Sequence, residues 1–149
     1  VGYNMSLRRK AFDYFEPALK PYWQNFEMEA CLQVKDRGYK VIFDFSNVVK
    51  HYPTNQAYAG GREGDLEVKI FNAAYNQALI LAKHSSWSIG LFRFFYLMLI
   101  GNTNAPGLFL LPFTVIHYRN IKREFMIAKR VFRSRLEGWN LGKVYAKRQ

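Results

Sequence analysis

The residue types that most often do chemistry in proteins are few and widely separated in this sequence. The histidines are His51, His84 and His117, and the single cysteine is Cys31. A metal site needs several ligands at close spacing, and none of the histidines has a second His, Cys or Asp at such a distance. We therefore predict no metal site, no cofactor and no disulfide within the chain, and we interpret the histidines as polar tips at helix ends or interfaces.

Acidic clusters and one glycine-rich loop are the remaining candidates for catalysis or phosphate binding. Glu27 and Glu29, and the acidic residues within 63–67, are explained by helix starts and solvated faces, because carboxylates stabilise the first turn of a helix. The loop at 59–65 lacks the Lys-Ser/Thr ending of a phosphate-binding loop, and its own carboxylates would repel a phosphate. The sequence thus predicts a linker at this loop and a protein that is not an enzyme.

The composition points instead to anionic and apolar partners. The 149 residues include 13 Phe, 10 Tyr and 3 Trp, and 22 Lys and Arg against 11 Asp and Glu give a formal net charge of +11. Aromatic side chains collect at interfaces, and a basic excess favours lipid headgroups, nucleic acid or an acidic protein. Most of the excess lies between residue 117 and the end of the chain. The carboxyl-terminal part is therefore the expected region of anion contact.

The middle of the chain is apolar, because the 25 residues from 94 to 118 carry no full charge. As one helix this stretch would be about 37 Å long, against about 30 Å for the hydrocarbon core of a bilayer. Aromatic residues bracket it as aromatic belts do, an arginine near its start is placed to snorkel, and basic residues follow it at once. We expect membrane or lipid contact from these residues: Trp87, Arg93, Tyr118, Arg119, Lys122 and Arg123.

A polar break interrupts the apolar stretch at its centre. The break consists of Gly101, Asn102, Asn104 and Pro106. Its glycine can end a helix, its second asparagine can cap the next helix, and its proline tolerates a first helical turn. Two membrane geometries fit: one broken helix that crosses the bilayer, or a hairpin with limbs at 87–100 and 106–118 that is too short to cross. A soluble hairpin, with the limbs as its own core, is the third interpretation.

Helical spacing also occurs before the apolar stretch. The apolar residues predict a helix over 6–16 and another over 22–35 that stops at Gly38. The segment 39–52 fits a strand or a helix, with helix favoured because nothing nearby would pair with a strand. Residues 53–64 are rich in glycine and polar side chains, which is typical of a loop.

Two longer helices are predicted after this loop. One starts with Asp65 as its cap, buries a wide stripe of small and apolar residues, and is expected to continue into the apolar stretch. The other, in the basic tail, repeats apolar side chains at helical spacing between Lys and Arg, which predicts an amphipathic basic helix. Its apolar positions are Ile121, Phe125, Ala128, Phe132 and Leu136.

The predicted fold is therefore mainly α-helical, with a long helical hairpin or broken membrane helix and shorter helices packed on it. The chain divides into three parts. Residues 1–64 form a helical and extended segment that packs against partners, and 65–118 hold the long helix and the broken, membrane-associated segment. Residues 119–149 form the basic amphipathic helix and tail. Because the apolar stripes are wide for so small a core, we expect the chain to fold against partners.

These features predict a non-catalytic accessory subunit of an energy-converting complex in the mitochondrial inner membrane, of the respiratory chain or of ATP synthase. Its work would be assembly, lipid contact and structural support, with other subunits and anionic lipid such as cardiolipin as partners. The basic carboxyl terminus is expected on the matrix side. The organelle is inferred from the basicity, the absence of a secretory signal and the first residue, Val1.

Two other functions remain open at this stage. The basic tail with its interleaved aromatic residues would also suit an RNA-contacting ribosomal protein of an organelle. Nucleic acid is the less favoured partner, because RNA binding does not need a long uncharged stretch flanked by aromatic residues. The third function is an enzyme or lipid-handling protein whose site lies in the apolar centre, with Asn102 and Asn104 as polar anchors.

Overall fold

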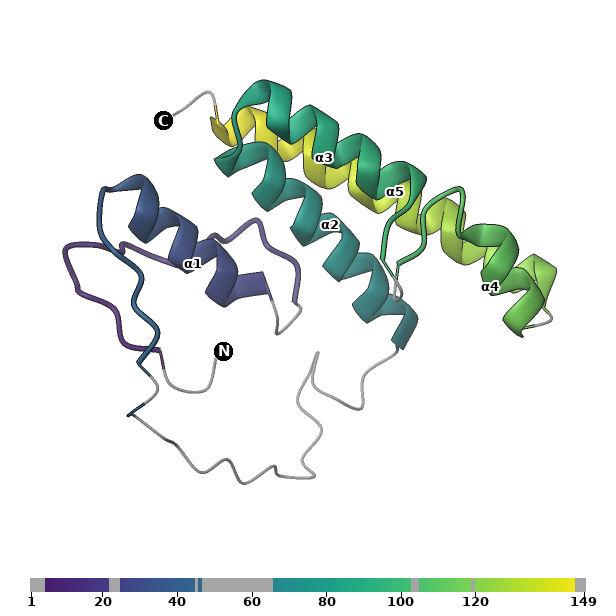
Figure 1. The fold of residues 1–149 in the computed structure, drawn as a ribbon, viewed down its shortest axis with the longest axis horizontal. Coiled ribbons are helices and arrows are strands. Elements are labelled where there is room, and N and C mark those ends of the chain that lie inside the picture. Colours follow the sequence, from purple (N-terminus) through teal and green to yellow (C-terminus); the bar gives the residue numbers. More distant parts are fainter. Residues whose placement is uncertain are drawn as a thin grey trace.

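The computed structural model describes residues 5–21, 25–44, 46, 66–102, 105–118 and 120–146, and its regular structure there is helical (Figure 1). The prediction of a mainly α-helical fold is confirmed. The helices within the described residues are α1 (Asn25–Asp36), α2 (Leu66–His84), α3 (Trp87–Leu99), α4 (Leu111–Tyr118) and α5 (Ile121–Ala146).

The centre of the fold is the pair formed by α2 and α5. A Cβ atom added to Gly138 would lie 2.2 Å from the carbonyl oxygen of Tyr75, and one added to Gly142 would lie 2.4 Å from that of Leu79. Both helices advance by four residues between these contacts, so they run in the same direction, as Figure 1 shows. Only glycine allows the two backbones to approach so closely. The partner surface on α2 is also built from small buried residues: Ala74, Ala78 and Ala82.

Helix α2 ends at His84 and does not continue into the apolar stretch. The prediction of one continuous helix here was wrong. The chain turns at Ser85 and Ser86, and α3 runs back along α5 (Figure 1). The carbonyl of Ser86 accepts a hydrogen bond from the N–H of Gly90 at 2.8 Å, which opens α3. Ser86 is the N-cap residue of α3 without a side-chain capping hydrogen bond, and two serines in succession interrupt the apolar spacing. The ring of Phe94 then stacks on Trp139 of α5, with centroids 4.5 Å apart.

The polar break ends α3 as predicted. Gly101 has a φ of 75° and its N–H donates to the carbonyl of Tyr96 at 3.1 Å, an arrangement that glycine favours just after a helix. The chain then folds inward, and Gly101 pairs with Pro106 in an isolated antiparallel bridge. Between them Ala105 is buried in a cluster with Ala74 of α2 and Val131 of α5. The break is therefore a tucked loop that contacts the core.

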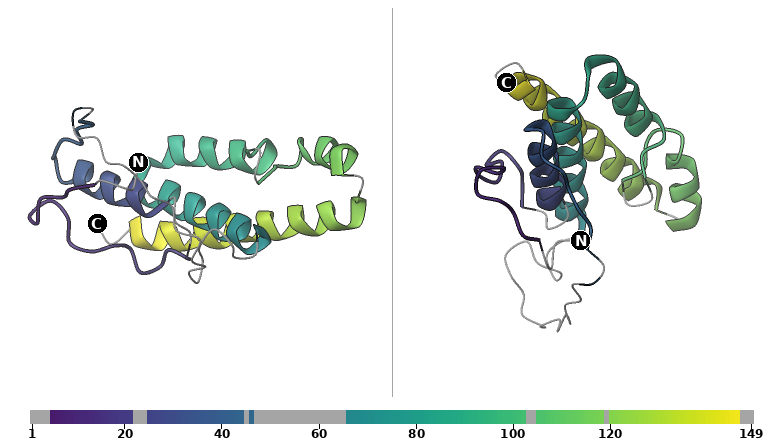
Figure 2. Two further views of the ribbon diagram at one scale, coloured as in Figure 1. Left: turned by 90° about the horizontal axis from the view of Figure 1, so that it is seen from below. Right: turned by 60° about the vertical axis from the view of Figure 1, so that its left-hand side comes forward.

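The next helix, α4, begins only at Leu111, not at the proline, and it continues in the direction of α3 (Figure 2). The limbs expected at 87–100 and 106–118 thus do not fold back on each other. The returning limb is α5, which lies along both α3 and α4. Among the residues that the structure covers, no helix is both long and apolar enough to cross a membrane.

The amino-terminal segment and α1 cover α2 on the side away from α3 (Figure 1). Asn76 of α2 is fully buried beneath this segment and pairs with the backbone of Lys20 twice, as acceptor from its N–H and as donor to its carbonyl, at 2.8 Å each. In α1 the side chains of Ala30 and Val34 are buried as its spacing predicted, and Gly38 follows with a φ of 78°.

Two predictions for the amino-terminal part do not hold. Residues 6–16 form a turn near Ala11 within an otherwise non-helical segment, and Phe15 is half exposed. The segment is extended because Glu16 reaches Lys83 of α2, a contact that local spacing does not reveal. Residues 39–44 are also non-helical and exposed. Most of 45–65, with the predicted loop and the Asp65 cap, lies outside the described residues.

Candidate functional site

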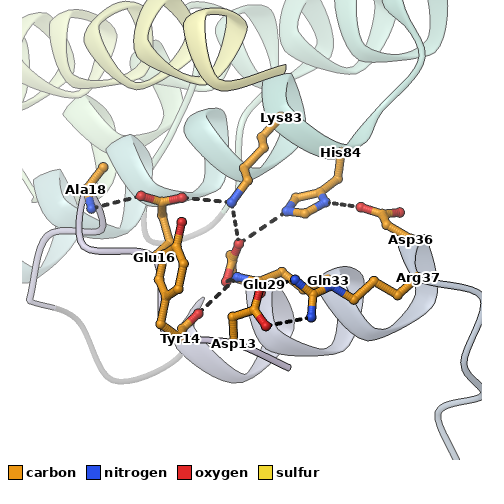
Figure 3. Close-up of polar contacts among 10 residues, drawn as sticks. All are labelled: Asp13, Tyr14, Glu16, Ala18, Glu29, Gln33, Asp36, Arg37, Lys83 and His84. Carbon is orange, nitrogen blue, oxygen red and sulfur yellow. Dashed lines mark hydrogen bonds and ion pairs between the residues drawn. The ribbon is translucent and has the colours of Figure 1, made fainter. Parts of the chain in front are cut away.

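A buried polar cluster lies where α2 ends beside α1 (Figure 3). The Nζ atom of Lys83 is 2.7 Å from Glu16 Oε2 and 2.8 Å from Glu29 Oε1. The same Glu29 oxygen is 3.3 Å from Nε2 of His84, whose Nδ1 contacts Asp36. The side chains of Lys83, Glu16, Glu29 and His84 are at most 7% exposed. The cluster therefore joins the amino-terminal segment, α1 and α2 in one network.

Hydrogen bonds favour the charged forms of these side chains, whereas burial by itself would favour their neutral forms. Burial alone would raise the pKa of Glu29, but hydrogen bonds from His84, Lys83 and Gln33 lower it below its ordinary value. Burial would likewise lower the pKa of His84, but its bonds to Glu29 and Asp36 raise it. The pKa of Lys83 is raised in the same way by its two carboxylates. All three groups are stabilised in their charged forms.

The cluster is closed by its own contacts. Glu29 accepts from Lys83 and Gln33 and pairs with His84, while Glu16 accepts from Lys83 and from the N–H of Ala18. No group of His, Cys, Asp and Glu in the described part of the chain could hold a metal ion. We interpret the cluster as a clasp that holds both the amino-terminal segment and α1 on α2, because Lys83 of α2 pairs with Glu16 of the first and with Glu29 of the second.

The prediction that Glu29 lies on a solvated face was wrong, since its side chain is fully buried. The sequence held one usable signal: Glu29 lies one turn before Gln33 and directly beside Ala30, which belongs to the inward stripe of α1. Cys31 is half-buried, and burial together with the charge of Glu27 raises the pKa of its thiol. A free cysteine on a helix is most often a small buried apolar residue, whereas Cys31 is only partly covered.

The second candidate site is an extensive apolar surface over α3, α4 and one side of α5, here called the apolar face. Its most exposed members are Phe92 at 75%, Ile116 at 74% and Trp87 at 72%. With aromatic side chains of about 150–250 Å² each, the face is larger than the few hundred Å² that a monomer usually exposes. It consists of Trp87, Ile89, Phe92, Phe95, Tyr96, Leu99, Ile100, Leu108, Phe109, Phe113, Ile116, Ile121, Phe125, Phe132 and Leu136.

The helix α3 shows why this surface is unusual. Its inward side buries Phe94 and Met98 against α2 and α5, while its outward side exposes Phe92, Tyr96 and Leu99. A helix that is apolar on every side is normally covered on every side, by protein or by lipid. The outward side of α3 therefore calls for a partner that the described part of the chain does not supply.

The helix α5 has two different apolar sides. The side that packs on α2 contains Ile127, Val131, Gly138 and Gly142. The stripe predicted from spacing is a different one, and apart from half-buried Ala128 it is exposed, from 68% at Ile121 to 37% at Leu136. Leu136 and Phe132 precede Trp139 by about one and two helical turns. Because Trp139 stacks on α3, the exposed stripe borders α3 and extends the apolar face.

Of the predicted membrane-contact residues, the structure describes Trp87, Arg93, Lys122 and Arg123 as exposed. Trp87 is exposed at the start of α3, Arg93 is exposed on the same helix, and Lys122 is exposed in the first turn of α5. Arg123 is exposed but turned to α2, where its Nε lies 3.2 Å from Glu67 Oε1. Tyr118 ends α4. Its side chain, like the whole of Arg119, is outside what the structure describes.

The predicted helix break is buried only in part, because Gly101 and Pro106 are buried while Asn102 is exposed. The Oδ1 atom of Asn102 accepts from the N–H of Ala105 at 2.7 Å, so this amide holds the loop together, while Asn104 lies outside the described residues. Sequence reasoning missed Arg135, which is 1% exposed beneath the loop and donates to the carbonyl of Ala105. Its Nε has no hydrogen-bond partner among the described residues, and burial lowers its pKa to about 10.

No protein-family model, no curated protein and no solved structure matches this chain. The two sites are therefore the features that indicate a function. The polar cluster has satisfied its charges within the chain, whereas the apolar face is exposed and bordered by basic residues. The apolar face is the better candidate for contact with another molecule.

Proposed function

We propose that this protein is a non-catalytic accessory subunit that docks its apolar face onto the membrane sector of an energy-converting complex in the mitochondrial inner membrane. Its basic helix α5 would lie on the matrix side, following the tendency of basic segments to remain there. The observation that carries the proposal is the apolar face itself, which extends over α3, α4 and the exposed stripe of α5. Assembly, lipid contact and structural support are the roles that such a surface serves.

The packing of α5 supports docking in the plane of the membrane surface. α3 and α4 lie along α5, and α5 exposes basic residues from Lys122 near its start to Lys143 near its end (Figure 2). Each Lys or Arg at the centre of a bilayer costs about 2.5–3.5 kcal/mol. A segment packed along such a helix would have to bring these charges into the hydrocarbon if it crossed. An interfacial helix instead keeps its charges in the headgroup region and its apolar side below them.

The distribution of arginines favours lipid over RNA. Arg123 pairs with Glu67, the guanidinium of Arg130 lies 4.9 Å from the ring centroid of Phe71, and Arg133 pairs with Glu137 at 2.9 Å. These interactions use cations that an RNA-contacting surface would direct to phosphates. The exposed residues beside the remaining cations are aliphatic or aromatic over three helices, which suits an acyl boundary.

Flotation of the purified chain with phospholipid vesicles tests the proposal. We expect the wild-type chain to float with the vesicles, and the variant Phe92→Asp with Phe113→Asp to bind at least about tenfold more weakly, a change of roughly 1.4 kcal/mol. Both side chains are more than 60% exposed, so the helical circular dichroism should be unchanged. A chain that remains a monomer in buffer and binds no vesicle would refute the proposal.

The matched control changes two apolar residues outside the face. Val41→Asp with Ile42→Asp also places two carboxylates at exposed apolar positions, 49% and 81% exposed, on the non-helical segment after α1. This variant should float like the wild type. Equal losses in both variants would mean that added negative charge, not the apolar face, controls binding.

The cellular setting needs a separate measurement. In mitochondria solubilised with mild detergent, the chain should migrate with an inner-membrane complex on native gels, and nuclease treatment should not release it. Migration with ribosomal particles that is lost on nuclease treatment would support the RNA-contacting alternative. That result would refute the membrane-subunit assignment.

A further inference from the structure

The basic residues of α5 differ in what they contact. Arg123 and Arg130 are directed to Glu67 and Phe71 on α2, and Arg135 is buried under the loop. These cations take part in the fold. The charge that remains for a partner must therefore come from other positions.

Three lysines on α5 form a separate group, here called the lysine line. It consists of Lys122, Lys129 and Lys143. The steps between them are multiples of seven residues, close to whole pairs of helical turns, so the three side chains follow one side of the helix. All three are exposed, and none has a hydrogen bond or ion pair with another described residue.

The lysine line runs along the edge of the apolar face. Leu136 occupies the missing position of the same seven-residue series, between Lys129 and Lys143. Phe125 lies one turn before Lys129, and Ile121 directly precedes Lys122. Arg133, on the polar side of the line, is 82% exposed and pairs with Glu137, which also pairs with Lys20. The free positive charge next to the apolar stripe is thus supplied by the lysines.

We infer that the lysine line binds the phosphates of anionic phospholipids while the adjoining apolar stripe enters the acyl boundary. The inference rests on the proposed function and adds the class of lipid. Lysine is a compact point charge without the bidentate geometry of arginine. The line therefore responds to the negative charge of the surface, and not to one headgroup. Binding should follow the total charge of the lipid mixture and weaken with added salt.

Flotation on two kinds of vesicle tests this inference, one of phosphatidylcholine alone and one with added phosphatidylglycerol. We expect the wild-type chain to prefer the anionic vesicles on the order of 100-fold, the contribution of three surface cations. The variant K122Q/K129Q/K143Q should lose this preference and keep the weaker binding to phosphatidylcholine, which the apolar face provides.

The control variant R8Q/R9Q/K10Q removes the same number of charges from exposed positions on the amino-terminal segment, and it should retain the preference. If the control loses as much as the lysine variant, net charge explains the effect and the lysine line is refuted. Equal binding of the wild type to both vesicles also refutes the lysine line but leaves the proposed function intact. Absence of binding to either vesicle refutes the proposed function.

Discussion

A single carboxylate, that of Glu29, organises much of the contact between α1 and α2. It interacts with Lys83 and His84 from α2 and with Gln33 from its own helix. Removing one partner of such a buried network leaves another charge unpaired, which costs more than the net contribution of the pair. Loss of one charge should therefore weaken the whole clasp. The protonation of its members should control how firmly the amino-terminal segment and α1 are held on α2.

The first residue-scale prediction is a loss of stability at alkaline pH. The pKa of His84 is raised above its ordinary 6.5, so its charged form contributes stability below that pH and the contribution disappears as the pH rises through the raised value. Thermal melting should therefore move to lower temperature as the pH rises above the ordinary 6.5 and through the raised pKa of His84. His84→Gln should flatten this dependence, because the raised pKa belongs to the His84 side chain. An unchanged slope in the His84 variant would contradict the assignment.

Acidic pH should also destabilise the clasp, in this case through the carboxyl group of Glu29. The pKa of Glu29 is lowered from its ordinary 4.5, so its contribution is present above that value and disappears as the pH falls further. The two groups together place the stability maximum of the clasp between their folded pKa values. Melting curves recorded over the acid range would show a second decrease.

At the scale of elements, the parallel pair of α2 and α5 depends on two glycines. Gly138 and Gly142 bring the backbone of α5 against the carbonyls of Tyr75 and Leu79. Small residues spaced by four let helices approach closely in this way. The exposed stripe of α5 is free to serve the apolar face because this other side makes the internal contact.

Gly138→Ala should therefore destabilise the fold severely. Its new Cβ would lie 2.2 Å from a backbone oxygen that cannot move without shifting α2, and we expect a loss of about 3 kcal/mol or more in the free energy of unfolding, measured with urea. Asn140→Ala, at an exposed position between the two glycines, should change it by less than about 0.5 kcal/mol. Wild-type stability in the glycine variant would show that the helices are farther apart.

At the scale of the whole molecule, two opposite sides carry different kinds of residues. The clasp and α1 cover α2 on one side, while the apolar face and the lysine line lie on α3, α4 and α5 on the other (Figure 1). Such separation is typical of proteins that rest on a membrane surface, where one side meets lipid and the other meets water or protein.

This orientation predicts a shallow position for Trp87. A variant with Trp23→Phe and Trp139→Phe retains this one tryptophan, and the second change keeps an aromatic partner for Phe94. Its fluorescence should shift to the blue on binding anionic vesicles. Lipids brominated near the headgroups should quench it more strongly than lipids brominated near the bilayer centre. Strongest quenching at the centre would indicate a crossing segment instead.

Much of the fold could be predicted from local patterns. Gly38 and Gly101 end their helices as expected, because a left-handed residue after a helix is a local requirement. The basic amphipathic helix and the apolar centre were also visible, since charge and helical spacing are properties of consecutive residues. The turn at Ser85 and Ser86 was missed because an apolar helix can continue or reverse with the same spacing.

The sequence by itself determined that the fold is mainly helical, where positive charge gathers and that apolar side chains exceed what a small core can hold. Only the tertiary structure decided that Glu29 is buried, that α4 continues in line with α3, and that α5 packs through its glycines while its aromatic stripe stays exposed. The physical reason is that the spacing of apolar residues reveals each apolar side of a helix but does not show which side is buried. The buried side is decided by the shape and register of a helix that is distant in the chain. In this protein α5 buries the side that contains its glycines, because that side lets the backbones of α2 and α5 approach most closely.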